Sequence, residues 1–274
     1  MSSMLQTIGS KCTDTTKAVF RKLSVSLRDY PDFIIIGAMK AGTTSLFSYL
    51  SQHYQLKSSF AKELHYFDSP NYKENSHHWY LTRFPVKSSD IQTFEASPRY
   101  ILNPDVPERI HKTIPGVKLI AILRNPVERA ISHYFHMVRN GIEELSLIDA
   151  LKAEEGRLEY ALKNRDYLEA RYVNYSYKLR GHYAEQIEAY YKHFDKEDIL
   201  ILNMADLRED THGTLKQIYD YVGVDNSVVI EDLKPRNVSK NKKAVDEEVY
   251  EYLNDYFSDH NQKLYQLVNK DFGW

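Results

Sequence analysis

A glycine-rich loop with one lysine is the most chemically suggestive segment of this 274-residue chain. Gly37 and Gly42 bracket Lys40, and the hydroxyl-rich run Thr43–Ser45 follows directly. Glycines let a backbone approach a ligand closely, and a lysine supplies a mobile cation. Amides at the start of a helix lack internal partners and attract anions. The combination predicts a phosphate-binding loop. The alternative is an ordinary turn between a strand and a helix, in which the glycines serve only tight packing.

This loop needs a strand before it and a helix after it. Phe33–Ile36 is a short apolar run rich in β-branched residues, which is typical of a fully buried parallel strand. After the loop, Leu46 and Leu50 recur at the spacing of a helix face that packs on a core. In the common ATP-binding loop the lysine directly follows the second glycine. Here Thr43 occupies that position and Lys40 lies inside the loop, so this loop is a variant.

An arginine follows a second buried strand. The apolar run Val117–Leu123 leads into Arg124, and Asn125–Glu128 then supplies an N-cap, a first-turn proline and the acid of a capping box. Ser132 lies about two turns along the resulting helix. Ligands bind beyond the carboxyl ends of parallel strands, so Arg124 and Ser132 together can hold one phosphate. Alternatively, Arg124 is a structural ion-pair partner and Ser132 a small packing residue.

A third polar cluster, Lys-Glu-Leu-His-Tyr-Phe-Asp, occupies Lys62–Asp68. Glu63 is a candidate general base, because a carboxylate can take a proton from a hydroxyl. His65 is the rival base, since its ordinary pKa lies near ~6.5. The alternative interpretation makes Glu63 a surface charge and His65 a packed aromatic ring.

Buried strands alternate with helical segments along the chain, which predicts an α/β fold with a central parallel sheet flanked by helices. We expect a single domain over residues 31–274 and a lead-in over residues 1–30 that packs on its surface. The other predicted strands are Tyr54–Lys57, a strand ending near Ser97, and Ile199–Leu202. The other predicted helices are Val106–Thr113, Leu145–Leu162, Tyr183–Phe194, one around Leu215–Val222, and two final helices after the basic segment Lys234–Lys243.

Composition bounds the class of protein. The chain is 42% hydrophobic and 27% charged, with a net charge of −2, so it has no global basic excess for non-specific nucleic-acid binding. Cys12 is the only cysteine, which excludes an internal disulfide. No apolar run approaches the ~20 residues of a membrane span, and we expect a cytoplasmic protein. The eleven histidines are scattered without paired ligand spacing, so the sequence predicts no metal centre.

Both phosphate clusters and the segment between them resemble one known family. Gly37–Ser45 is similar to the 5′-phosphosulfate loop of sulfotransferases that use 3′-phosphoadenosine 5′-phosphosulfate (PAPS), and Leu123–Tyr134 is similar to their 3′-phosphate motif. Lys62–Asp68 resembles the segment with the catalytic glutamate in heparan sulfate 3-O-sulfotransferases, whose branch includes bacterial relatives. Arg180–Tyr183 and the terminal Asp271–Trp274 fit the same branch. The similarity covers nearly the whole chain after the lead-in.

The resemblance implies a P-loop-like sulfotransferase fold, PAPS as co-substrate, 3′-phosphoadenosine 5′-phosphate (PAP) as product, and no required metal. It implies that Lys40 and the loop amides stabilise the leaving phosphate oxygen, that Arg124 and Ser132 bind the 3′-phosphate, and that Glu63 or His65 takes the acceptor proton. The residues expected at the nucleotide are Lys40, Ala41, Gly42, Thr43, Thr44, Ser45, Arg124, Ser132, Tyr183, Ser239, Lys240, Lys242 and Lys243.

The acceptor is expected to be a hydroxyl on a carbohydrate, or a β-hydroxyl on an acyl chain held by an acyl carrier protein. The aromatic stretch Tyr66–Phe84 is expected to line its cleft. The chain departs from the glycosaminoglycan enzymes in two places. In the first place, Ala96 stands where those enzymes usually have a lysine, and Arg99 also differs from the residue that they have at that position. In the second, the segment Arg236–Lys243 has no cysteine, whereas those enzymes have a disulfide there. These departures bear on the acceptor and not on the donor.

Two other functions stay open at this point. An ATP-dependent small-molecule kinase needs a Mg²⁺-ligating acid at the end of a buried strand, where this chain has Arg124. A non-catalytic nucleotide- or glycan-binding module would keep its function without Glu63 and His65.

Overall fold

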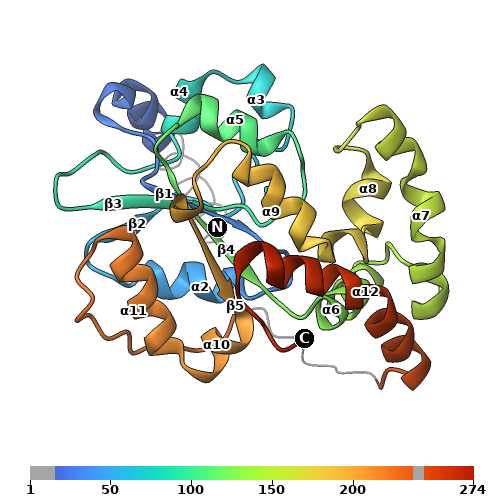
Figure 1. Ribbon diagram of the computed structural model, residues 1–274. Helices are drawn as coiled ribbons and strands as arrows, with labels where there is room; N and C mark the ends of the chain where they lie inside the picture. Colours follow the sequence, from blue (N-terminus) through green and yellow to red (C-terminus); the bar gives the residue numbers. More distant parts are fainter. Residues whose placement is uncertain (1–15, 237–243) are drawn as a thin grey trace, which may run out of the picture.

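A five-stranded sheet forms the centre of the molecule, and all of its strand pairs are parallel (Figure 1). The computed structural model describes residues 16–236 and 244–274. The sheet order is β2-β3-β1-β4-β5. Its strands are β1 (Phe33–Gly37), β2 (Leu56–Ser58), β3 (Gln92–Ala96), β4 (Lys118–Leu123) and β5 (Ile199–Asn203). The predicted α/β fold with a central parallel sheet is therefore confirmed.

Helices cover both faces of the sheet because successive side chains of a strand point to opposite faces. Ile34 and Ile36 of β1 pack in one core, and Phe33 and Ile35 pack in the other. The first core is covered by α3 (Asn71–Glu74), α4 (His77–Leu81), α5 (Val106–Thr113) and α9 (Tyr183–Tyr191), and the second by α2 (Thr43–Leu50), α10 (Met204–Glu209) and α11 (Thr211–Val222).

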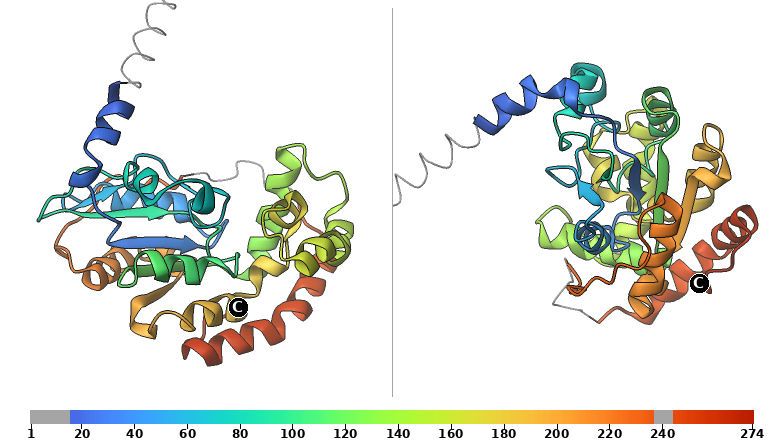
Figure 2. Two further views of the ribbon diagram at one scale, coloured as in Figure 1. Left: turned by 90° about the horizontal axis from the view of Figure 1, so that it is seen from above. Right: turned by 90° about the vertical axis from the view of Figure 1, so that its left-hand side faces the viewer.

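A third core lies beyond the carboxyl ends of the strands. It joins three helices, α6 (Pro126–Arg139), α7 (Leu147–Asn164) and α12 (Glu247–Val268), and α8 (Ala170–Tyr175) packs on α7. Short 3₁₀ turns occupy Val25–Leu27, Leu179–Gly181 and Lys196–Asp198. Before the first strand, residues 16–23 form a helix that stands out from the domain (Figure 2).

Two sequence expectations about this architecture are wrong. The chain ends in one 22-residue helix, α12, and not in two helices. Its apolar positions Val249, Leu253, Phe257 and Leu264 keep one stripe buried throughout. In addition, four of the aromatic rings in the stretch Tyr66–Phe84 do not line a cleft.

Those rings are part of the core because they pack on one another as well as on the sheet. Tyr66, Phe67, Tyr80 and Phe84 are all fully buried. Tyr66 and Tyr80 stack with their ring centroids 4.6 Å apart. Aromatic pairs of this kind stabilise a core beyond their area of contact. These four rings therefore support the neighbouring loop from the core, whereas Tyr72 and Trp79 of the same stretch are only partly buried.

Candidate active site

The glycine loop between β1 and α2 has the geometry of an anion site. Gly42 adopts a left-handed conformation (φ 87°) as the N-cap of α2, so the first amides of α2 face outward from the loop. A Cβ on Gly37 would lie 2.4 Å from the Ile101 side chain, which shows why this position needs glycine. Lys40, between them, also holds a positive φ of 70°. A non-glycine residue in that region is strained, and such strain is concentrated at functional sites.

Arg124 lies beside this loop. It follows β4, and its guanidinium Nη1 donates to the backbone carbonyl of Lys40 across 3.2 Å. Asn125 is the N-cap of α6 as predicted, and its side chain accepts from the amides of Val127 and Glu128. The Glu128 carboxylate pairs with Arg124 Nη2 at 3.2 Å. It therefore contributes to holding the arginine at the strand end.

The face of α6 that follows Arg124 is basic and turns toward Lys40. Burial lowers the Lys40 pKa, and the charges of Arg139, Arg124 and Arg129 lower it further. His136 also feels the charge of Lys40. Ser132, half-buried, lies one turn before His136 and so shares its helix face. Like charges held this close are stabilised by a bound anion, and the arrangement fits a ligand with more than one phosphate group.

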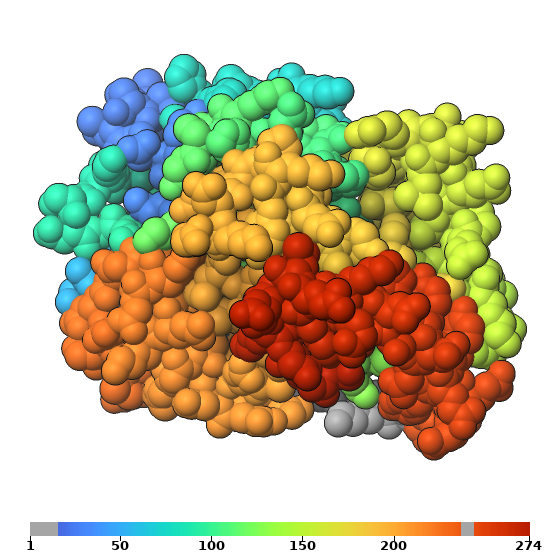
Figure 3. Space-filling view, viewed as in Figure 1, coloured from blue at the N-terminus to red at the C-terminus, as the bar shows by residue number. Residues whose placement is uncertain are grey.

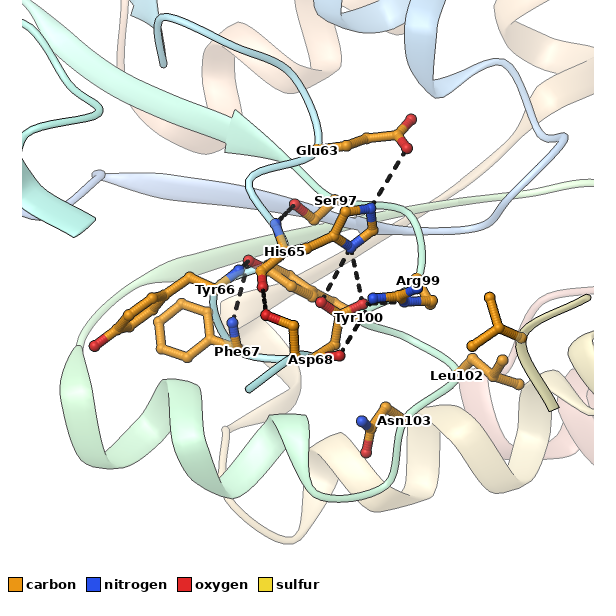
Figure 4. Close-up of polar contacts among 12 residues, drawn as sticks. Glu63, His65, Tyr66, Phe67, Asp68, Ser97, Arg99, Tyr100, Leu102 and Asn103 are labelled. Atoms are coloured by element: carbon orange, nitrogen blue, oxygen red, sulfur yellow. Dashed lines mark hydrogen bonds and ion pairs between the residues drawn. The ribbon is translucent and has the colours of Figure 1, made fainter. Parts of the chain in front are cut away.

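The loop after β2 brings a carboxylate and an imidazole to the same edge of the sheet (Figure 4). The Glu63 amide donates to the Ala96 carbonyl at the end of β3 across 2.9 Å. His65 Nε2 lies 3.6 Å from the Glu63 carboxylate, and Nδ1 lies 3.0 Å from Asp68. Asp68 is fully buried and also pairs with Arg99. Glu63 and His65 both have positive φ, of 62° and 50°, which adds two strained residues to this edge.

The charges of Glu63 and His65 follow from the contacts of their side chains. The contact with His65, and after it the contact with Lys62, lower the Glu63 pKa to about 2 against the opposing effect of burial. Burial alone would lower the His65 pKa, but Asp68 and Glu63 together raise it to about 9. At neutral pH, Glu63 is therefore a carboxylate and His65 an imidazolium. Glu63 also acts electrostatically on His136, which places it near the basic face of α6.

Comparison with known proteins decides the family. A family model described as the sulfotransferase domain matches residues 30–266. The chain belongs to the sulfotransferase family. A crystal structure of a sulfotransferase from Alicyclobacillus acidocaldarius is similar, with a TM-score of 0.75 and 27% identity, and the match covers 89% of this chain and 98% of that one. The resemblance inferred from the motifs is therefore confirmed, as is the sulfotransferase fold.

Two curated relatives of this sulfotransferase come from eukaryotes. The membrane-associated sulfotransferase kil1 of Dictyostelium discoideum is 29% identical, over 89% of this chain and 66% of its own length. The heparan sulfate glucosamine 3-O-sulfotransferase 3B1 of Mus musculus is 26% identical, over 90% and 65%. The chain thus spans about two thirds of the length of these relatives. None of the helices described combines the length and apolar character needed to cross a bilayer.

A buried polar network fixes the loop that carries Glu63 and His65 in this sulfotransferase. Ser97 Oγ accepts from the His65 amide at 3.4 Å, and Tyr100 Oη accepts from the Tyr66 amide at 3.0 Å. Both hydroxyls then donate to the carboxylate of Glu95, which is fully buried. Burial raises the Glu95 pKa to about 7. This network is a structural reason for the conformation of residues 63–67.

The structure places the other predicted nucleotide residues as follows. Tyr183 is buried, and its hydroxyl donates to the Arg124 carbonyl at 2.9 Å, so it supports the strand end. Its direct contact with a nucleotide stays a prediction. Ser45 Oγ accepts from the Arg236 amide at 2.9 Å, which brings the start of the basic segment against α2. Ala41 and Thr43 are buried in the loop, and Thr44 lies beside them on α2. Ser239, Lys240, Lys242 and Lys243 lie outside the described residues.

Sequence reasoning missed several residues that the fold brings to this site. Arg129, His136 and Arg139 are absent from the predicted site, although these residues recur seven and three positions apart along α6 and so share one helix face. That helical spacing was a usable signal. Asp68 was seen only as part of a charged run. Its connection to Arg99 crosses from the β2 loop to the β3 loop, and no sequence pattern reports such a contact.

Proposed function

We propose that this chain transfers a sulfuryl group from PAPS to an acceptor hydroxyl. The observation that carries the proposal is the contact between Arg124 and the backbone of Lys40, because it joins the two expected phosphate sites at one edge of the sheet. The separate strand ends of β1 and β4 are neighbours there. Ligands of open α/β sheets bind at such an edge.

The donor-binding residues divide into two groups. Lys40, with the amides of Gly42 to Ser45, holds the 5′-phosphosulfate end, where the N-terminus of α2 favours negative charge. Arg124 and Ser132 hold the 3′-phosphate. The Arg124 guanidinium donates one hydrogen bond to the Lys40 carbonyl and one to the Glu128 carboxylate, and a guanidinium has five N–H donors in all. It thus has donors left for a phosphate.

When bound, PAPS supplies the sulfuryl group and leaves as PAP. Lys40 and the loop amides stabilise the charge that develops on the leaving oxygen, as preorganised donors do. Glu63, which is a carboxylate at neutral pH, takes the proton of the acceptor hydroxyl. His65 carries its own proton at neutral pH, so it is not the base. It orients Glu63 through the ion pair, while Asp68 holds its other nitrogen.

The acceptor belongs to the proposal as well. Similarity to a heparan sulfate glucosamine 3-O-sulfotransferase favours a carbohydrate hydroxyl as the acceptor. A β-hydroxyacyl chain on an acyl carrier protein is the alternative acceptor. Lys62, beside Glu63, supplies a cation for an anionic acceptor. A cytoplasmic location stays a prediction, as does the boundary between residues 1–30 and the domain.

Two experiments test this function. In a calorimetric titration without Mg²⁺, PAP should bind tightly, and Mg-ATP should bind at least tenfold more weakly. Preference for Mg-ATP would instead support the kinase, although the strand end at Arg124 offers no metal-ligating acid. A screen with radiolabelled PAPS against oligosaccharides and β-hydroxyacyl carrier proteins should then label one class. Labelling of neither, despite tight PAP binding, would leave a nucleotide-binding module.

A further inference from the structure

His260 of α12 meets His182 and Glu185, which lie at the start of α9 and at least 75 positions earlier in the chain. These helices lie side by side on the face shown in Figure 3, and the three side chains are those of His182, Glu185 and His260. One ligating atom from each lies within 4.8 Å of the others. The sequence analysis predicts no metal centre because it rests only on the spacing of the histidines along the chain. Here the fold brings together residues from two helices that are 75 or more positions apart.

The nitrogen and oxygen atoms of this cluster lie close together. His182 Nε2 hydrogen-bonds the Tyr256 hydroxyl at 2.9 Å, which leaves Nδ1 as its ligating atom. His260 Nδ1 is buried and has no hydrogen-bond partner within the described residues. It lies 3.4 Å from the Glu185 carboxylate, close but without hydrogen-bond geometry. A buried ring nitrogen in this state costs free energy unless another group satisfies it.

We propose that His182, Glu185 and His260 bind a borderline divalent metal ion of the Zn²⁺ type, with water completing the shell. Two imidazole nitrogens and one carboxylate oxygen are a donor set that Zn²⁺ accepts and that Mg²⁺ and Ca²⁺ disfavour. The Tyr256 hydroxyl then holds the outer nitrogen of His182, as partners of metal-bound histidines do. Glu185 also lines an open hollow with Glu188 and Lys263.

Binding requires a small local adjustment. Ligand atoms around tetrahedral zinc lie about 3.3 Å apart for bonds of about 2.0 Å, and the present atoms are somewhat wider. The rings of His182 and His260 stack at 3.9 Å with 12° between their planes, so they must tilt for both lone pairs to meet at one point. Glu185 is 46% exposed and free to swing inward.

The ion would pin the C-terminal helix to the helix that supports the donor site. Tyr183, next to His182, donates to the Arg124 carbonyl. Gly181, on the other side, is packed so closely that a Cβ would meet Phe257 at 2.6 Å and Pro126 at 2.9 Å. The site therefore lies at the junction of α6, α9 and α12. Its role is to stabilise this junction, independently of the chemistry at Glu63.

The test is metal binding by the tag-free full chain after chelator treatment. Titration with Zn²⁺ should show one site per chain and raise Tm, and Co²⁺ should give the visible absorption of a four-coordinate site. Glu185→Gln, an exposed change, and His260→Asn should each weaken Zn²⁺ affinity at least ~10-fold. His212→Asn, at an exposed histidine on α11, is the matched control and should leave affinity unchanged.

The outcomes separate cleanly. Absence of a stoichiometric Zn²⁺ or Co²⁺ site in the wild-type chain overturns the proposal. Equal Zn²⁺ affinity in Glu185→Gln and wild type overturns it too, because the ion would then be bound elsewhere. If His260→Asn fails to fold, Glu185→Gln alone decides. PAP affinity is measured in the same samples, so that a failure of the proposed metal site is distinguished from a failure of the proposed PAPS site.

Discussion

The Arg124 guanidinium donates a hydrogen bond to the backbone carbonyl of Lys40 across 3.2 Å. The two residues are 84 positions apart, yet the parallel pairing of β1 with β4 makes their strand ends neighbours. Glu128 on α6 and Tyr183 on α9 hold Arg124 from two further elements. The backbone and the guanidinium of Arg124 are thus both held beside the Lys40 loop, and such preorganisation lowers the cost of binding a ligand.

Replacing Lys40 with Ala should reduce kcat by about 10²–10³, because it removes a preorganised donor to the leaving oxygen. The measurement is initial rate with PAPS and the acceptor that the screen identifies, alongside calorimetry with PAP. Lys163→Ala, at an exposed lysine of α7, is the control and should keep wild-type rates. A Lys40 variant with undiminished kcat would contradict the role.

Replacing Arg124 with Ala should abolish discrimination for the 3′-phosphate. We expect PAP affinity to fall about 10–100-fold and AMP affinity to change little, since charge-assisted hydrogen bonds to one phosphate are lost. Ser132→Ala should shift the same PAP-to-AMP ratio in the same direction by a smaller factor. Equal losses for PAP and AMP would show that Arg124 supports the fold and does not read the 3′-phosphate.

Replacing Glu63 with Gln should lower kcat by about 10²–10⁴ while PAP affinity stays unchanged, because only proton removal from the acceptor is lost. Single-turnover rates under saturating PAPS give the measurement. Glu128→Gln is a useful comparison, since it alters a nearby carboxylate that touches Arg124 and should change PAP affinity more than kcat. Retained turnover in Glu63→Gln removes this residue from the proposed role.

His65 should make stability fall as pH rises from about 6.5 to about 9. Its pKa is raised in the folded state, so the folded protein binds more protons than the unfolded chain in this window and loses stability toward its upper end. The contribution is on the order of 2 kcal/mol. Denaturant unfolding at pH 6 and pH 9 should show a smaller decline for His65→Gln than for wild type. An identical decline in both proteins contradicts the ion-pair assignment.

Two glycine-to-alanine changes should have opposite signs. Gly37→Ala places a Cβ 2.4 Å from Ile101 and should destabilise the fold by about 1–3 kcal/mol, as overpacking does. Gly156→Ala lies on an exposed face of α7 with open space around it. It should stabilise the fold by about 0.5–1 kcal/mol, since alanine is the better helix former. Thermal melts of the two variants against wild type give both signs.

The sequence alone determined the local elements around the donor site. The buried runs of β1 and β4, the left-handed glycine before α2 and the N-cap at Asn125 are all set by residues a few positions apart. Local sterics and local hydrogen bonds govern these features, so spacing reports them. The motif order also sufficed for the family, which residues 30–266 confirm.

Only the tertiary structure decided which charges face one another. Glu128 pairs with Arg124, His65 lies between Glu63 and Asp68, and His182 stacks on His260. Four of the aromatic rings expected in a cleft, those of Tyr66, Phe67, Tyr80 and Phe84, are instead buried in the core beneath the loop that carries Glu63. Burial and electrostatic interactions depend on distance through space, and residues from different strands and helices acquire that proximity only when the sheet assembles.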